Sequence, residues 1–161
     1  MMTYKIGHGY DVHRLVADRA LILGGVRIPY SLGLLGHSDA DCLLHAVMDA
    51  VLGALGMGDI GRHFPDSDPA YQGADSCALA RSVFEMMQAK HYKIGNIDVT
   101  VVAQKPKLAP YIATMQSRLS EVFSCDASLV NIKATTEEGL GFTGRGEAIA
   151  AHAVCLLVAD E

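Results

Sequence analysis

The sequence predicts an α/β or α+β fold in which a single mixed β-sheet carries helices packed on one face. Segments with the two-residue alternation of strands are interspersed with segments whose apolar residues recur at helical spacing. Their order is strand, strand, strand, helix, helix, strand, helix, strand, strand. Of the 161 residues, 50% are hydrophobic, which suffices for one sizeable core. We therefore expect residues 1–161 to form a single domain.

The first third of the chain is predicted to be mainly β-structure. Residues 4–13 alternate as a strand does, and residues 20–28 form two short apolar runs separated by Gly24-Gly25, which is typical of a hairpin. A helix is then expected over residues 43–55, where apolar side chains recur at helical spacing after a polar start. Residues 58–73 carry turn signals and little periodicity, so we expect a long loop there, and such loops are often functional.

The second half of the chain is predicted to alternate helices and strands. A helix from Asp75 to about Lys90 precedes a turn at Gly95-Asn96 and a strand over residues 97–103. The remaining predicted elements are a helix starting near Pro110, a strand over residues 130–135 and a strand over residues 147–158. The many alanines of the last segment make a helix the alternative there.

The composition argues against several classes of function. The chain has 13 Lys and Arg against 18 Asp and Glu, a formal charge of -5, which argues against binding of nucleic acid or an anionic membrane. No apolar run is long enough to cross a bilayer and the chain opens without a signal peptide, so we expect a cytoplasmic protein. The cysteines form no C-x-x-C pair, and we interpret them as buried, reduced thiols.

Two segments carry candidate metal ligands. In Asp11-Val12-His13 the first and third residues project to the same side of an extended chain and can hold one ion. His45 lies on the first predicted helix, and one carboxylate with two imidazoles forms a zinc set of the catalytic kind, with a fourth position left open. Asp41 and Asp49 share a helical stripe with His45 and could orient its imidazole. The alternative is that Asp11 and His13 lie on a solvated surface, that Asp41 and Asp49 merely solvate the helix, and that His45 is a satisfied polar residue.

We leave other histidines out of this metal set. Strand alternation sends His8 to the face opposite Asp11. His63 and His91 are expected to be exposed, and His152 is expected to be a partly buried strand residue.

A second cluster suits phosphate binding. Residues 133–139 place two threonines and two glutamates at a strand exit, before a glycine-rich turn, which suits a diphosphate bridged by a divalent cation. The alternative is an ordinary turn with solvated glutamates. Lys105 and Lys107 follow another strand end, where they either contact phosphate or simply lie on the surface.

Taken together, these motifs resemble one enzyme family. The residues that carry the resemblance are Gly-His-Gly-Tyr-Asp-Val-His at 7–13, Gly-Gly-Val-Arg-Ile-Pro at 24–29, Leu-Leu-Gly-His-Ser-Asp-Ala-Asp at 34–41, Gly-Asp-Ile-Gly-Arg-His-Phe-Pro-Asp at 58–66, Lys-Ala-Thr-Thr-Glu-Glu at 133–138 and Gly-Phe-Thr-Gly-Arg-Gly-Glu at 141–147. From Tyr4 to about Val158 the chain resembles the 2-C-methyl-D-erythritol 2,4-cyclodiphosphate synthases of the non-mevalonate isoprenoid pathway. In that family the 2-phosphate of 4-diphosphocytidyl-2-C-methyl-D-erythritol 2-phosphate attacks the β-phosphorus, CMP leaves and a cyclic diphosphate forms, with no protein nucleophile.

The resemblance implies cofactors and site residues. The residues carried over are Asp11, His13 and His45 for one Zn²⁺ per subunit, Glu138 for a Mg²⁺ or Mn²⁺ on the substrate diphosphate, and His37 and Thr136 for catalysis. The expected substrate contacts are Asp11, His13, His37, Ser38, Asp49, Asp59, Ile60, Gly61, Phe64, Pro65, Asp66, Ser67, Ala103, Gln104, Lys105, Pro106, Lys107, Leu108, Ala134, Thr135, Thr136, Glu137, Glu138, Phe142 and Arg145. Among these, residues 103–108 with Ala134 and Thr135 would form the cytidine pocket.

The resemblance also implies a homotrimer around a central axis, with active sites between adjacent subunits. Arg145 and Glu147 match residues at one end of an axial cavity, in which an isoprenoid diphosphate could bind. Glu137 departs from the Thr or Asn that is frequent in the family. The sequence lacks the cytidylyltransferase domain that is fused to this enzyme in some bacteria, so the preceding pathway step is not expected.

Two other functions remain open from the sequence. A metal-dependent phosphohydrolase would release linear phosphates from a similar diphosphate. A small-ligand-binding trimer would hold an isoprenoid diphosphate without turnover.

Overall fold

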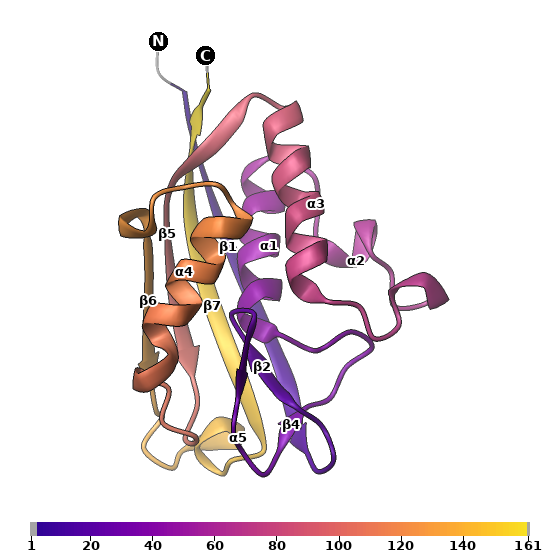
Figure 1. Cartoon of the computed structure of the whole chain (residues 1–161), viewed down its shortest axis with the longest axis vertical. Coiled ribbons are helices and arrows are strands. Elements are labelled where there is room, and N and C mark those ends of the chain that lie inside the picture. The colour runs from indigo at the N-terminus through magenta and orange to yellow at the C-terminus, as the bar shows by residue number, and fades with distance from the viewer. Residues whose placement is uncertain (1–2, 161) are drawn as a thin grey trace.

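The computed structural model describes residues 3–160 and places five strands in one sheet, in the order β4-β1-β7-β5-β6 (Figure 1). The strands are β1 (Tyr4–Val16), β4 (Gly33–Leu34), β5 (Tyr92–Val102), β6 (Val130–Thr135) and β7 (Ala148–Ala159). β5 and β6 are parallel and the other neighbours are antiparallel, so the sheet is mixed, as predicted. The strands β2 (Leu21–Leu23) and β3 (Val26–Ile28) pair with each other as the predicted hairpin.

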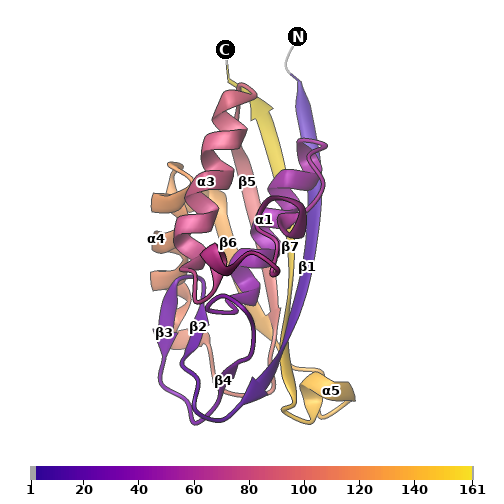
Figure 2. The same cartoon turned by 90° about the vertical axis from the view of Figure 1, so that its right-hand side faces the viewer.

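Three long helices cover one face of this sheet, which confirms the predicted arrangement (Figure 2). They are α1 (Cys42–Ala54), α3 (Ser76–Ala89) and α4 (Ile112–Val122). The shorter helical segments are α2 (Ile60–His63), α5 (Gly141–Gly144) and the 3-10 turns Pro69–Tyr71, Ala109–Tyr111 and Ala127–Leu129. None of the helices within residues 3–160 combines the length and the apolar character needed to cross a bilayer.

Two glycines let α1 lie directly against β1. A Cβ atom at Gly7 would lie 1.7 Å from the carbonyl oxygen of Ala50, and one at Gly9 would lie 1.8 Å from that of Ala46. Any side chain at either position would push the helix away from the strand. Because side chains alternate along a strand, the polar residues two and four positions after Gly9 also face α1. The close approach therefore brings those residues next to His45.

β7 has two different faces and is a strand rather than the helix that its alanines allowed. On the helix side Ala151 and Ala153 are fully buried, whereas His152 and Val154 are exposed on the opposite face. The expectation that His152 is partly buried is therefore wrong within this chain. His8 lies on the same opposite face, as predicted, with its Nε2 3.3 Å from Nδ1 of His152.

The face of the sheet away from the helices carries exposed apolar side chains. These outer-face residues are Tyr4, Ile6, Tyr10, Val12 and Val154. Ile6 is 73% exposed, which is a high value for an isoleucine side chain in a strand. A patch of this kind marks a surface that another molecule covers in many proteins.

Three local predictions need correction. Gly95-Asn96 is not a turn, because Gly95 sits at a register shift inside β5, which begins at Tyr92. The segment 58–73 is not only loop, since it contains α2 and a 3-10 turn. Cys125 is half-buried, whereas the other three cysteines are buried and all four are free thiols.

Candidate metal and substrate site

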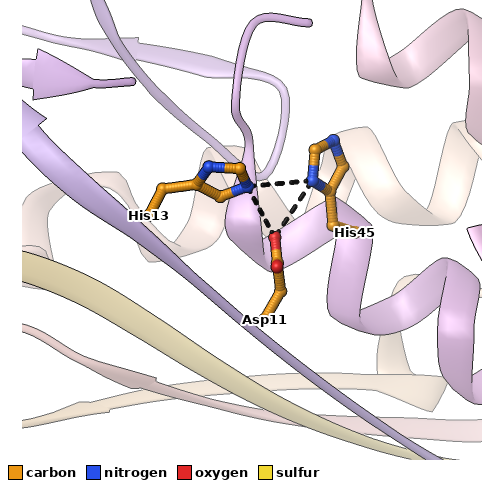
Figure 3. A group of neighbouring side chains, drawn as sticks. All are labelled: Asp11, His13 and His45. Atoms are coloured by element: carbon orange, nitrogen blue, oxygen red, sulfur yellow. Dashed lines mark hydrogen bonds and ion pairs between the residues drawn. The ribbon is translucent and has the colours of Figure 1, made fainter. Parts of the chain in front are cut away.

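The candidate metal ligands meet where β1 faces the first half of α1 (Figure 3). Oδ2 of Asp11 lies 2.8 Å from Nε2 of His13 and 3.0 Å from Nδ1 of His45, and these two ring nitrogens are 3.3 Å apart. In the part of the chain that the structure describes, no other three His, Cys, Asp or Glu side chains come together closely enough to share an ion. The structure therefore brings the three candidate ligands together.

Hydrogen bonds away from the meeting point fix which nitrogen of each imidazole carries its proton. The carbonyl oxygen of Leu35 can only accept, so Nδ1–H of His13 donates to it at 2.8 Å and leaves a lone pair on Nε2. Nε2 of His45 lies 3.0 Å from Oγ of Ser76 and 3.3 Å from Oγ of Ser38. With its proton on Nε2, His45 points the lone pair of Nδ1 at Asp11.

This donor set fits a zinc ion. Two imidazole lone pairs and one carboxylate oxygen converge, and they repel one another unless a positive charge lies between them. Three protein ligands of this kind with one open position are the pattern of catalytic zinc sites. His45 is 7% exposed, so the site sits at the edge of the core.

The contacts within the cluster also shift the pKa values of Asp11 and His13. Burial acts to raise the pKa of Asp11, but hydrogen bonds with His13 and His45 and their charge outweigh burial and lower that pKa to about 2. Burial acts to lower the pKa of His13, and the bond to Asp11 raises it overall. The cluster thus favours a cation, either a proton on histidine or a metal ion in its place.

Asp41 and Asp49 do not orient the His45 imidazole, contrary to the prediction. Asp41 is the N-cap of α1, and its carboxylate accepts from the backbone N–H groups of Leu44 at 3.0 Å, Gly24 at 2.9 Å and Gly25 at 2.7 Å. It therefore ties the β2–β3 hairpin to the start of α1, and its complete burial raises its pKa to about 6. The Asp49 carboxylate instead accepts from the backbone N–H that opens α2.

A small cavity of about 40 Å³ adjoins the metal cluster. Its lining consists of His37, Ser38, His45, Met48, Ile60, Phe64, Asp66, Tyr71 and Leu79. Five of the expected substrate contacts thus lie beside the cluster: His37, Ser38, Ile60, Phe64 and Asp66. Gly61, Pro65 and Ser67 belong to the same segment but not to this lining, and Asp59 caps α2 through the N–H of Arg62 at 3.0 Å.

A larger cavity of about 670 Å³ opens where β5 and β6 end. Its lining consists of Tyr30, the run from Ala103 to Ala109, and Ala134, Thr135 and Thr136. All the residues expected to form the cytidine pocket are included, and the volume is in the range of small-molecule sites. No sequence pattern predicts a role for Tyr30, which follows β3 and lines this cavity.

The loop after β6 is held by its own contacts. Oγ1 of Thr143 donates to Oε2 of Glu137 at 2.5 Å, so this carboxylate is engaged with α5. The N–H of Glu138 donates to Oγ1 of Thr136 at 3.2 Å, and Glu138 has a positive φ of 53°. The side chain of Glu138 is exposed and remains available to a ligand.

Phe142 and Arg145 lie apart from both of these cavities. Phe142 lines a separate cavity of about 320 Å³ with Val12, Arg14, Glu147 and Ala148. Arg145 donates through Nε to Glu147 at 2.9 Å. The structure therefore does not bring these two expected contacts to the metal cluster within one chain.

The metal cluster and the larger cavity also share no lining residue, because they belong to different parts of the sheet. The cluster is built on β1, and the cavity lies at the ends of β5 and β6. In the strand order, β7 separates β1 from β5, and β6 forms the edge opposite β4.

Comparison with known proteins assigns the family. The sequence model of the YgbB family matches residues 4–158. A protein named 2-C-methyl-D-erythritol 2,4-cyclodiphosphate synthase, from Syntrophotalea carbinolica, is 61% identical over 153 residues, which are 95% of this chain and 93% of that protein.

Solved structures agree with the sequence match. The bifunctional IspDF of Campylobacter jejuni superposes with a TM-score of 0.96 at 38% identity, and the match covers 100% of this chain and 44% of that one. A CDP complex of Plasmodium falciparum IspF superposes with a TM-score of 0.87 at 35% identity and covers 98% of this chain and 97% of that one. The chain therefore belongs to the YgbB family, together with relatives named 2-C-methyl-D-erythritol 2,4-cyclodiphosphate synthase.

Proposed function

We propose that this chain converts 4-diphosphocytidyl-2-C-methyl-D-erythritol 2-phosphate to 2-C-methyl-D-erythritol 2,4-cyclodiphosphate with release of CMP, as a phosphorus–oxygen lyase of the non-mevalonate pathway. The observation that carries the proposal is the convergence of one carboxylate and two imidazole lone pairs beside a cavity, in a chain 61% identical to a protein of that name. We further propose that residues 1–161 act as one synthase domain. The CDP bound in a related structure supports a cytidine nucleotide as part of the substrate.

Asp11, His13 and His45 would hold Zn²⁺, and Glu138 would share Mg²⁺ or Mn²⁺ with the substrate diphosphate. A single carboxylate suits the second metal, because Mg²⁺ is often bound by one or two carboxylates and by phosphate oxygens. When bound, these ions supply Lewis acidity that neutralises charge on the phosphoryl oxygens.

The side chains of this chain would contribute positioning and hydrogen bonds. An intramolecular phosphate attack needs its two reacting groups held close and in line, and it needs no nucleophile from the protein. His37 lines the cavity next to the metal cluster, and Thr136 lines the larger cavity. They would bind phosphate oxygens at two points of one extended substrate, and Lys105 and Lys107 would add positive charge beside the larger cavity.

We propose that the active sites form between subunits of a homotrimer. The exposed outer-face residues give an apolar surface for a second copy, and the two parts of the site lie towards opposite edges of the sheet. In such an assembly the metal cluster of one subunit would face the larger cavity of its neighbour. The cavity lined by Phe142 and Arg14 lies beside Val12 of the outer face, which is consistent with an isoprenoid diphosphate bound near the axis.

The test is a product analysis by mass spectrometry. The parent protein with Zn²⁺ and Mg²⁺ is expected to yield the cyclic diphosphate and CMP. His45→Ala leaves two of three zinc ligands and is expected to reduce turnover by at least about 100-fold. His91→Ala, at an exposed histidine after α3, is the matched control and should retain turnover.

Two other products would contradict the proposal. Linear phosphates would favour a metal-dependent phosphohydrolase. Substrate binding without any product from the zinc-loaded parent would favour a small-ligand-binding protein.

A further inference from the structure

We infer that Ser76 and Asp39 are positioning residues that hold the His45 imidazole in the tautomer and orientation needed to bind a metal. Neither residue was predicted to belong to the site. The inference rests on the metal cluster of the proposed function, but it concerns metal binding and not turnover.

Ser76 is the first residue of α3 and is fully buried, and its side chain reaches His45 across the gap between α3 and α1. Its hydroxyl donates to Oδ1 of Asp39, and its backbone N–H donates to Oδ2 of the same carboxylate at 3.0 Å. The hydroxyl has only one proton, and that proton is committed to Asp39. Towards His45 the Ser76 oxygen can therefore act only as an acceptor.

Because the Ser76 oxygen can only accept, it determines which ring nitrogen of His45 carries the proton. Nε2 of His45, 3.0 Å from Oγ of Ser76, must carry the ring proton to make the bond. Nδ1 then keeps its lone pair and faces Asp11 and His13. Outer partners of this kind orient metal-binding histidines and raise their basicity in other metal sites.

Ser38 is a weaker candidate for the same role. Its hydroxyl lies 3.3 Å from Nε2 of His45 and accepts from the N–H of Ala40 at 3.1 Å. The longer distance and the only half-buried position of Ser38 make it a secondary contact. Ser76, in contrast, is 0% exposed.

Asp39 is itself held in place by the backbone. Its N–H donates to the carbonyl of Ala74 at 3.0 Å, and Oδ1 accepts from the N–H of Asp41 at 3.1 Å. The bond to Ala74 ties the segment before α1 to the segment before α3. The start of α3 therefore determines where the groups that contact the His45 ring lie.

The Ser76 hydroxyl has no capping role that would explain its burial. The N-cap of α3 is Asp75, whose side chain accepts from the N–H of Cys77 at 2.9 Å. Removing the Ser76 hydroxyl should therefore leave the helix start intact. Its main effect should fall on Asp39 and His45.

The experiment compares Ser76→Ala with Ser82→Ala, two substitutions on the same helix. The hydroxyl of Ser82 bonds only within α3, to the carbonyl of Ala78 at 3.4 Å. Zinc dissociation constants are measured by competition with a chromophoric chelator, under conditions where circular dichroism shows both variants folded. Ser76→Ala is expected to bind Zn²⁺ at least about 10-fold more weakly than the parent, and Ser82→Ala is expected to match the parent.

A second measurement uses the parent alone and does not depend on the folding of a variant. Nitrogen-15 NMR of the zinc-loaded parent reports which ring nitrogen of His45 carries hydrogen. The inference expects hydrogen on Nε2 and zinc on Nδ1. Zinc on Nε2, or a Ser76→Ala variant that is folded and binds Zn²⁺ within about twofold of the parent, would overturn the inference.

The experiments distinguish a failure of this inference from a failure of the proposed function. A parent that binds zinc through this arrangement and makes no cyclic product would contradict the proposed function only. A parent that makes the product while Ser76→Ala keeps its zinc affinity would contradict this inference only.

Discussion

Asp49 is a carboxylate that the fold keeps half-buried next to the candidate site. Its Oδ1 accepts from the N–H of Ile60 at 2.8 Å, which fixes the start of α2 against α1. Burial raises the pKa of Asp49, and the charges of Asp59 and Asp11 add to the rise. The ionised form of Asp49, which substrate binding would use, therefore lowers the stability of the folded state.

Asp49→Asn is expected to become more stable relative to the parent as the pH rises. A carboxyl group whose pKa is raised on folding stabilises the fold below its unfolded pKa, and that contribution is lost as the pH rises through the folded pKa. The parent therefore loses stability from about pH 4 upward, whereas asparagine has no charge and still offers an oxygen to Ile60. Urea unfolding of both metal-free proteins at about pH 4 and about pH 7 measures the difference in unfolding free energy.

Asp126→Asn is a control with the opposite sign. Hydrogen bonds from Ser128 lower the pKa of Asp126. Relative to the parent, this variant should therefore become less stable as the pH rises. If the unfolding free energy relative to the parent changes with pH in the same direction for both variants, the pH dependence does not come from these carboxylates.

The supporting residues of the site show the limit of inference from sequence at this scale. Helical spacing put His45 on one stripe of the first predicted helix, and it assigned Asp41 and Asp49 on that stripe as its partners. Periodicity shows which side chains share a stripe of one helix, and it carries no information about what a second helix brings against that stripe. The residue that contacts Nε2 of His45 at 3.0 Å is Ser76, 31 positions away in the sequence.

At the scale of elements, the contact between β1 and α1 decides whether the metal ligands meet. Gly9→Ala would place a Cβ atom 1.8 Å from a helix carbonyl oxygen, so α1 would have to move. We expect a loss of about 3 kcal/mol or more in unfolding free energy, together with weaker zinc binding, because His45 moves with the helix. Urea unfolding and chelator competition measure the two effects.

Gly53→Ala is the matched control within α1. A Cβ atom at Gly53 would meet nothing within 4 Å, and alanine is the better helix former. The expected result is a gain of roughly 0.5–1 kcal/mol with unchanged zinc affinity. Equal losses in both variants would contradict the close-approach role of Gly9.

Most elements could be predicted from the sequence, and the failures have a common cause. Periodicity identified the long helices and the alternating strands, including β7, where pairing with β1 on one side and β5 on the other decides against a helix. Gly95-Asn96 was interpreted as a turn because glycine suits both turns and bulges, and only its pairing with β7 tells them apart. α2 escaped prediction because it has only four residues and because its first N–H is held by Asp49, a tertiary contact.

At the scale of the whole molecule, the two parts of the candidate site are split across the sheet. The metal cluster lies between β1 and α1, and the larger cavity lies where β5 and β6 end, with β7 between β1 and β5 in the sheet. The family resemblance implied this division between subunits, which composition and periodicity alone could not show. The apolar outer face suggests how a second and third copy would bring the two parts together.

Mixing two inactive variants tests this arrangement. His45→Ala damages the metal cluster, and Thr136→Ala damages the larger cavity. If each site takes one part from each of two neighbours, trimers reassembled from an equal mixture contain some sites with both parts intact. Half of the subunits carry each intact part, so about one quarter of the parent's activity is expected to return.

A mixture of His45→Ala with Asp11→Ala is the negative control, because both substitutions damage the same part and every metal cluster remains broken. The chain has a mass of 17.1 kDa, and sedimentation equilibrium of the parent should give three times that mass. A trimer in which the first mixture recovers nothing would mean that each site is complete within one subunit. A monomeric mass with full activity would mean the same and would also leave the outer face without its proposed partner.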